Sequence, residues 1–148
     1  MVISKLNLNR IQENLNLIGV FLEKLRRLSR ISRKDFLNDE RNPAAAESFL
    51  RRCIEAIFDI SRHILSKSFS YKTLEYKEVA KALGEKKVVS KDYGETLIKM
   101  AGYRNRMVHF YKEISPEELY DILINELKDI EDFLKEVEIF LHKYKSQI

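Results

Sequence analysis

The stretch Ser115–Tyr144, SPEELYDILINELKDIEDFLKEVEIFLHKY, decides the class of the fold. Its first four residues are typical of a helix start, with serine as the N-cap, proline at the first helical position and glutamate three residues after the serine. Apolar residues then recur every three or four positions, as they do on one broad face of a helix. We therefore predict one continuous helix from Ser115 to about Tyr144. Its apolar face consists of Leu119, Leu123, Leu127, Ile130, Leu134, Val137, Leu141 and Tyr144.

Two long helices are predicted in the first half of the chain. The first covers about residues 4–28, where leucine and isoleucine recur at alternating steps of three and four. The second covers about residues 42–68, with Asn42 as N-cap and Pro43 at the first helical position. The polar link between them has room for a short helical turn around residues 35–37.

The middle of the chain predicts one short helix and one long helix. The short helix covers about residues 74–83 and ends at Gly84, a residue type that commonly follows a helix. The long helix begins near Ser90 and ends between His109 and Lys112. His109 would then lie on the last turn of that helix.

The composition agrees with a helical fold. The 148 residues include only four glycines and two prolines, which are too few turn-forming residues for a β-rich fold of this size. The sequence therefore predicts an all-α, up-and-down bundle of about four long helices plus one short helix, in a single domain over residues 1–148. The wide apolar faces of the first and last helices leave room for a dimer interface.

Several classes of protein do not fit this sequence. No apolar run approaches the roughly 20 residues of a membrane helix, and the first residues lack the apolar core of a signal peptide. We expect a cytoplasmic protein that makes no membrane contact. Cys53 is the single cysteine, so no internal disulfide is possible, and we expect it to be a small buried apolar residue. No histidine has a second histidine or cysteine at metal-ligand spacing, so we expect no metal site.

Charge is distributed unevenly along the chain. The net charge is +4, but the last helix, from Glu117 onward, carries nine acids against four lysines. A basic run at the end of the first helix contains no acid, and two interpretations of it remain open. It could steer an anionic partner such as RNA, or it could be a solvated helix end that complements the helix dipole. The basic run consists of Lys24, Arg26, Arg27, Arg30, Arg33 and Lys34.

The segment AGYRNRMVHFY, residues 101–111, concentrates the chemistry of the chain. A histidine can take up and return a proton near neutral pH, and an arginine can hold a phosphate through two hydrogen bonds. Arg104 would also keep His109 neutral and able to act as a base. Asn105, one helical turn before His109, could fix the orientation of the imidazole. A base and a phosphate clamp suffice to cleave RNA through its own 2′-hydroxyl.

A second line of polar residues lies on the second long helix. Glu55, Asp59 and His63 follow one another at steps of four and share a helix face. They could act as a proton relay or contact RNA. The alternative, which we favour, is an exposed face on which Asp59 and His63 form a pair.

The string GYRNRMVHFY resembles the signature of the HepT-like toxins of the HEPN superfamily. The family pattern is arginine, four residues, histidine, one residue and tyrosine, which Arg104, His109 and Tyr111 meet. The stretch RCIEAIFDISRHIL in the second long helix and the Ser-Pro-Glu-Glu start of the last helix also resemble the family. The resemblance implies a HEPN-like helical bundle.

The resemblance also implies an activity and a mode of assembly. HepT-like proteins are metal-independent ribonucleases that act as homodimers, with two motifs meeting at the interface. By that analogy Arg104 would be the phosphate clamp, His109 the general acid and base, and Asn105 a supporting residue. Members are commonly encoded beside an MntA-like nucleotidyltransferase antitoxin, which uses ATP to transfer AMP to the motif tyrosine. Tyr111 holds that position here, and no cofactor is implied for the toxin itself.

Some alternatives stay open. The protein could be a non-catalytic helical partner of a nucleotidyltransferase that binds a nucleotide or presents a substrate, or a structural dimerisation bundle. Arg106 is not a motif position, and it could either add to RNA affinity or be solvated. We expect Tyr103 to be a core residue and Gly102 to allow two helices to approach closely.

Overall fold

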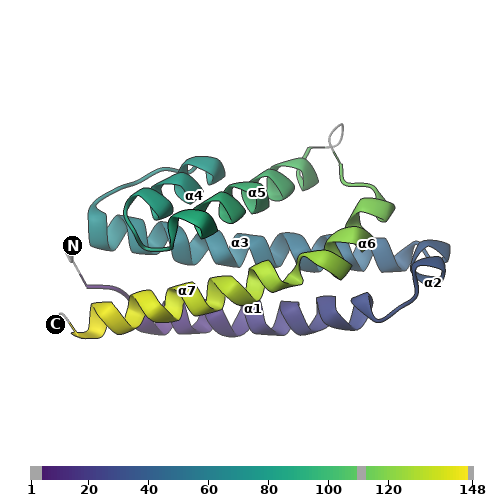
Figure 1. The fold of residues 1–148 in the computed structure, drawn as a ribbon, viewed down its shortest axis with the longest axis horizontal. Helices are drawn as coiled ribbons and strands as arrows, with labels where there is room; N and C mark the ends of the chain where they lie inside the picture. The colour runs from purple at the N-terminus through teal and green to yellow at the C-terminus, as the bar shows by residue number, and fades with distance from the viewer. Residues whose placement is uncertain (1–4, 110–112, 147–148) are drawn as a thin grey trace.

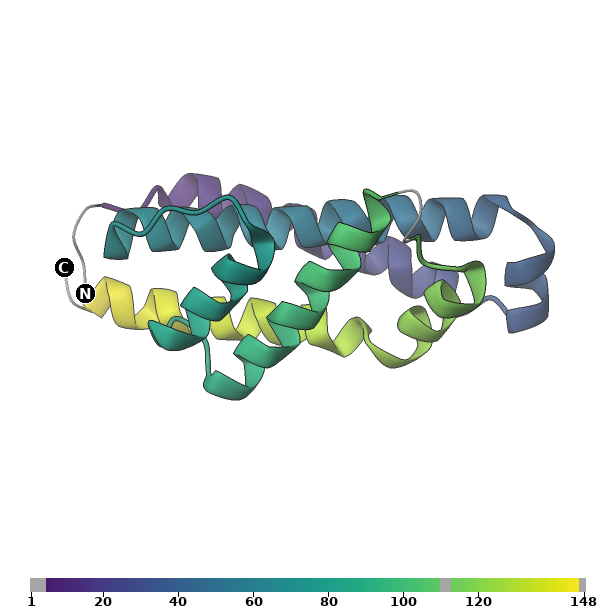
Figure 2. The same ribbon diagram turned by 90° about the horizontal axis from the view of Figure 1, so that it is seen from above.

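The computed structural model describes residues 5–109 and 113–146, and within these ranges it contains seven helices and no strand. The predicted all-α fold is therefore confirmed. The long helices run alternately in opposite directions, with α4 and α5 on one side of α3 and α1 and α7 on the other (Figure 1). From above, α4 and α5 cross the bundle obliquely, whereas α1, α3 and α7 follow its long axis (Figure 2). The helices are α1 (Leu8–Ser29), α2 (Arg33–Asn38), α3 (Arg41–Phe69), α4 (Tyr76–Glu85), α5 (Lys91–Met107), α6 (Pro116–Asn125) and α7 (Leu127–Ser146).

Helix α1 begins at Leu8, and the described residues 5–7 before it are not helical. The predicted start near residue 4 is therefore wrong. Asn7 is the N-cap, because its side-chain oxygen accepts a hydrogen bond from the backbone N–H of Arg10 at 3.1 Å. The preceding segment is fixed by the other end of the chain, since the backbone N–H of Leu6 donates to the Tyr144 hydroxyl at 3.0 Å. This contact joins the start of α1 to the end of α7.

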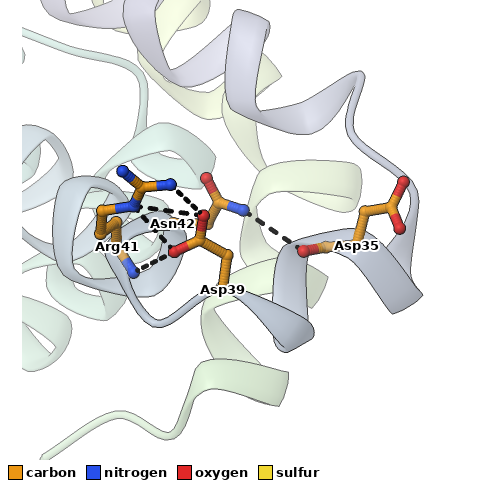
Figure 3. Close-up of polar contacts among 4 residues, drawn as sticks. All are labelled: Asp35, Asp39, Arg41 and Asn42. Carbon is orange, nitrogen blue, oxygen red and sulfur yellow. Dashed lines mark hydrogen bonds and ion pairs between the residues drawn. The ribbon is translucent and has the colours of Figure 1, made fainter.

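The link between α1 and α3 forms a complete short helix, α2, where a single turn was predicted. The expected cap at Asn42 is wrong, because α3 begins one residue earlier, at Arg41, and its N-cap is Glu40, which makes no side-chain cap hydrogen bond. The Asp39 carboxylate accepts from the backbone N–H of Arg41 at 3.0 Å and from its guanidinium, which lowers the pKa of Asp39 to about 2. Asn42 instead donates to the carbonyl of Asp35 at 3.4 Å and ties α3 to α2 (Figure 3).

Helices α4 and α5 form a tight hairpin. The predicted stop at Gly84 is wrong, since α4 continues to Glu85 and the left-handed residue after it is Lys87, with φ 60°. Gly84 serves the packing instead. A Cβ at Gly94 of α5 would lie 3.4 Å from the Cα of Gly84, so the two helix backbones meet here without side chains between them.

The predicted last helix is broken at Glu126, which separates α6 from α7. No glycine or proline causes the break, which coincides with contacts to α5. The Glu126 carboxylate accepts from the Tyr103 hydroxyl at 2.8 Å and pairs with Lys99. Burial, together with this carboxylate, raises the pKa of Tyr103 to about 12. One turn later, the Tyr93 hydroxyl donates to the backbone carbonyl of Asp129 at 2.5 Å.

The apolar core runs through the whole bundle, and α3 contributes its central row. The buried residues of α3 include Cys53, as predicted, and burial raises the pKa of its thiol to about 12. A thiol of this kind is an inert packing group. Among the described helices, none has the length and apolarity needed to cross a membrane.

Candidate functional site

Helix α5 presents the motif at its C-terminal end. The helix begins near Ser90, as predicted, and Ser90 is its N-cap, since its hydroxyl accepts from the backbone N–H of Tyr93 at 3.2 Å. The helix ends at Met107, earlier than predicted, so His109 lies beyond the last turn. The backbone N–H of His109 donates to the carbonyl of Arg106 at 3.2 Å, which continues the chain as a turn. The expectation that Asn105 and His109 share a helix face is therefore wrong.

The Arg104 side chain is directed toward α3 and α4. Its guanidinium carbon lies 4.1 Å from the centre of the Tyr76 ring, a close cation–π contact. Its Nε atom lies 3.7 Å from a carboxylate oxygen of Glu55. This Nε–H group is buried and makes no hydrogen bond to any described residue. Only 26% of the side chain is exposed, so Arg104 is largely immobilised between two helices.

Glu55 belongs to a row of alternating charges along α3. Arg51 donates to Glu47 at 3.2 Å and to Glu55 at 3.3 Å, and all three side chains are about two-thirds buried. Residues four apart on a helix are neighbours, so the row follows one face of α3. The row ends at Arg104, which is the only member that comes from another helix.

A second arginine shares the Tyr76 ring. The guanidinium carbon of Arg62 lies 5.0 Å from the ring centre, so Arg62 and Arg104 are both within reach of one aromatic side chain. Tyr76 is itself buried and packs against Phe58, with ring centres 4.8 Å apart and ring planes tilted by 37°. The ring is therefore a rigid support for two positive charges.

His109 lies near the start of α3, away from the part of α3 that Arg104 contacts. It lines a cavity of about 410 Å³ between the starts of α3 and α6 and the end of α5, together with Pro43, Glu47 and Pro116. Glu47, which lines this cavity, and Glu55, which contacts Arg104, are eight residues apart on α3, or about 12 Å along the helix axis. Arg104 therefore contacts α3 about two turns away from the part of α3 that lines the His109 cavity.

The neighbouring motif residues have structural partners. Arg106 donates two hydrogen bonds of 2.7 Å to the Glu118 carboxylate, which joins the end of α5 to the first turn of α6. The predicted cap of α6 is confirmed, since the Ser115 hydroxyl accepts from the backbone N–H of Glu118 at 3.1 Å. Asn105 is half-buried. Gly102 faces the side chain of Lys77, so the close helix approach that was expected there is wrong.

The basic run is largely paired with the acidic last helices. Arg26 pairs with Glu131 of α7, and Arg33 pairs with Asp121 of α6 at 2.9 Å. Lys24 lies over the Phe49 ring at 5.5 Å, and Arg27 pairs with Glu23 at 3.7 Å. Among the described residues, Arg30 and Lys34 make no salt bridge.

The predicted line of Glu55, Asp59 and His63 has different partners at each position. Asp59 binds Arg10 at 3.0 Å and Asn14 at 2.9 Å, both on α1. His63 is buried, and its Nε2 accepts from the backbone N–H of Asn7 at 2.9 Å. The favoured interpretation, an exposed face with an Asp59–His63 pair, is therefore wrong. Burial, followed by nearby Arg10 and Lys67, lowers the pKa of His63.

Sequence reasoning missed Tyr76, Arg51 and Arg62 and did not connect Glu55 with Arg104. The spacing of Glu47, Arg51 and Glu55 was a usable signal, because four-residue steps of alternating charge predict a paired row. Tyr111, the predicted site of modification, lies outside the described residues, as do the other residues between 109 and 113.

Comparison with known proteins decides the family. The family model described as ribonuclease HepT-like matches residues 18–137, which is most of the chain. The chain belongs to the ribonuclease HepT-like family. It is 28% identical over 131 residues to the tRNA nuclease HepT of Aphanizomenon flos-aquae (strain 2012/KM1/D3), covering 88% of this chain and 89% of that protein.

Two further similarities concern Shewanella oneidensis. The mRNA nuclease HepT of that organism is 28% identical over 85 residues, or 57% of this chain and 64% of that one. The solved structure of a tri-AMPylated HEPN toxin of Shewanella oneidensis in complex with an MNT antitoxin has the same fold. It superposes with a TM-score of 0.80 at 22% identity, over 88% of this chain and 97% of that chain.

Proposed function

We propose that this HepT-like protein is the ribonuclease toxin of a toxin–antitoxin pair, and that Arg104 and His109 carry out the cleavage. The observation that supports this proposal most is the state of Arg104. It is held between Glu55 and Tyr76 beside a helix end that also carries His109. An immobilised arginine near a histidine is the combination that cleavage at phosphorus requires.

The proposed reaction uses the RNA's own 2′-hydroxyl. His109 removes the hydroxyl proton, the 2′-oxygen forms a bond to the adjacent phosphorus, and the bond to the 5′-oxygen of the next nucleotide breaks. The protonated His109 returns this proton to the leaving 5′-oxygen, and Arg104 stabilises the charge that builds up on the phosphoryl oxygens. The products carry a 2′,3′-cyclic phosphate and a free 5′-hydroxyl. DNA lacks the 2′-hydroxyl and would not be cleaved.

A homodimer fits the spacing of the two residues. Within one chain Arg104 contacts Glu55, whereas His109 lines a cavity with Glu47, about two turns away on α3, so a second motif brought to the same surface would complete the site. Val108, directly before His109, is an exposed apolar residue and is suited to such an interface.

Regulation by a nucleotidyltransferase is the second part of the proposal. An MNT or MntA-like antitoxin would transfer AMP from ATP to Tyr111, two residues after His109 in the chain. The added phosphate would place negative charge beside the proposed catalytic pair and repel RNA. ATP is used by the partner alone, and the cytoplasmic location remains a prediction from the sequence.

The test is RNA cleavage by purified protein in EDTA, with His109→Ala beside the wild type and His142→Ala as the control. His142 is exposed on α7. We expect His109→Ala to lower the rate by about 10²–10⁴-fold, His142→Ala to have no effect, and the wild type to leave 2′,3′-cyclic phosphate ends. The mass of the Tyr111 peptide shows whether an AMP adduct silences the preparation. Unmodified protein that cleaves no RNA would favour the non-catalytic partner of a nucleotidyltransferase instead.

A further inference from the structure

The Arg104 side chain differs from Arg106 and Arg33 in how its partner approaches, and it shares an approach at Nε with Arg27 and Arg51. Arg106 uses both terminal nitrogens on Glu118 at 2.7 Å, and Arg33 uses a terminal nitrogen on Asp121 at 2.9 Å. Glu55 lies instead beside the Nε atom of Arg104, at 3.7 Å. A guanidinium has five N–H donors. A carboxylate at Nε can orient the group and leave the two terminal nitrogens for a substrate.

We propose that Glu55 and Tyr76 are positioning residues that hold the Arg104 guanidinium for the scissile phosphate. This inference rests on the proposed ribonuclease function. Glu55 fixes the rotation of the guanidinium through Nε, and the Tyr76 ring fixes its plane. Neither residue touches the reacting atoms.

The buried Nε–H group supports this assignment. A buried donor without an acceptor is costly, and Glu55 is 3.7 Å away, slightly too far for a hydrogen bond. Hydrogen bonds at catalytic sites often tighten only when substrate is bound. A phosphate that draws Arg104 into place would close this contact and satisfy the Nε–H group at the same time.

The row of charges on α3 keeps Glu55 in position. Arg51 binds Glu55 at 3.3 Å and is itself bound by Glu47 at 3.2 Å. Two carboxylates and the two arginines, Arg51 and Arg104, balance one another, so the row is electrically neutral. Arg62, on the same Tyr76 ring, adds a positive charge that an incoming phosphate would meet.

The first test separates positioning from a general charge effect. Glu55→Gln keeps the shape of the side chain and removes its charge, and Glu131→Gln is the matched control. Glu131 is similarly exposed and also pairs with a single arginine from another helix, Arg26. We expect Glu55→Gln to lower kcat for RNA cleavage by about 10- to 100-fold. KM should stay the same or fall, because removing a negative charge does not weaken phosphate binding.

Other kinetic results would overturn the inference. If kcat is unchanged and only KM falls, then Glu55 merely repels RNA. If Glu131→Gln lowers kcat equally, then the effect belongs to the fold. Tyr76→Phe should retain activity, whereas Tyr76→Leu should lower kcat, because only the ring is required. Thermal unfolding of each variant shows whether it remains folded.

The second test does not depend on cleavage. In a ¹⁵N NMR spectrum of the wild type, we expect the assigned Nε–H signal of Arg104 to exchange slowly with water, because this group is buried. Glu55→Gln should speed this exchange, and Glu131→Gln should not. An unchanged exchange rate in Glu55→Gln would overturn the positioning role. If the wild type cleaves no RNA but Glu55→Gln speeds the exchange of the Arg104 Nε–H group with water, then the proposed ribonuclease function fails. The role of Glu55 in positioning Arg104 would still hold.

Discussion

The two sides of α3 use arginine in different ways. On the side of α1, α6 and α7, Arg26 and Arg33 bind Glu131 and Asp121 at the surface, through short contacts that engage their terminal nitrogens. On the side of α4 and α5, Arg104 is stacked on an aromatic ring and has a carboxylate only beside Nε. The first side resembles ordinary surface pairing, which contributes little to stability. The second side keeps hydrogen-bonding capacity for a ligand.

This difference changes the interpretation of the charge pattern. In the sequence, a basic run and an acidic helix suggested a basic surface open to an anion. In the fold, those segments lie against each other, and two members of the basic run are neutralised by acids of α6 and α7. Arg104, which is held between Glu55 and the Tyr76 ring, is outside the run.

The largest effect should come from Arg104→Lys compared with Arg26→Lys. Lysine keeps the charge but loses the planar, bidentate donor group, and it stacks less well on Tyr76. We expect Arg104→Lys to lower the rate of RNA cleavage by about 10²-fold, while Arg26→Lys leaves it unchanged. Equal loss in both variants would remove the distinction between the two sides.

The α1 side should carry a pH dependence of stability, through His63. Its pKa in the folded protein lies below the ordinary value of 6.5, so the unfolded chain binds the proton first. The stabilisation is complete above that ordinary value and is lost as the pH falls toward the folded-state pKa. Protonation breaks the hydrogen bond from Asn7, which is worth about 1 kcal/mol.

Denaturant unfolding between about pH 7.5 and about pH 5.5 measures this dependence. His63→Gln, which can still accept from Asn7, should lose less stability over this range than the wild type. His142→Gln should keep the wild-type slope. A steeper slope in His63→Gln would contradict the assignment of His63 as a neutral acceptor.

The smallest effect should come from the basic run. If it steers RNA, the two members without salt bridges among the described residues, Arg30 and Lys34, have the most to offer. We expect the Arg30→Gln, Lys34→Gln double variant to reduce the slope of log affinity against log salt by about 1.4 for single-stranded RNA. The Arg26→Gln, Arg33→Gln double variant should reduce it less. If both double variants reduce the slope equally, then salt bridges at the surface do not decide which basic side chains bind RNA.

Local signals predicted the elements well where one residue decides the geometry. Ser115 caps its helix as expected, and the helix expected near Ser90 begins there, because a serine hydroxyl needs only the next turn of backbone to form a cap. The break at Glu126 could not be predicted, since it coincides with contacts to Tyr103 and Lys99 on another helix. Likewise, Asn42 is a good cap by type, but α3 begins before it, at Arg41, and the Asn42 side chain binds the carbonyl of Asp35 in α2 instead.

The same limit applies to the site. Arg104 and His109 could be chosen from one short segment and its resemblance to a family. Glu55 and Tyr76 lie 49 and 28 residues before Arg104, and only the crossing of α3, α4 and α5 brings them to it. A linear pattern shows which residues share a helix face, but not which face meets another helix.

The contact between Gly84 and Gly94 has an evolutionary consequence. A Cβ on either glycine alone would meet the opposite backbone at 3.7 Å or 3.4 Å, which is near ordinary contact. Either position can therefore drift to alanine first. Two methyl groups would have to share the same gap, so whichever glycine changes first removes that freedom from the other. In the hairpin that presents the motif, a substitution at Gly84 or Gly94 therefore restricts which residues the other position can later accept.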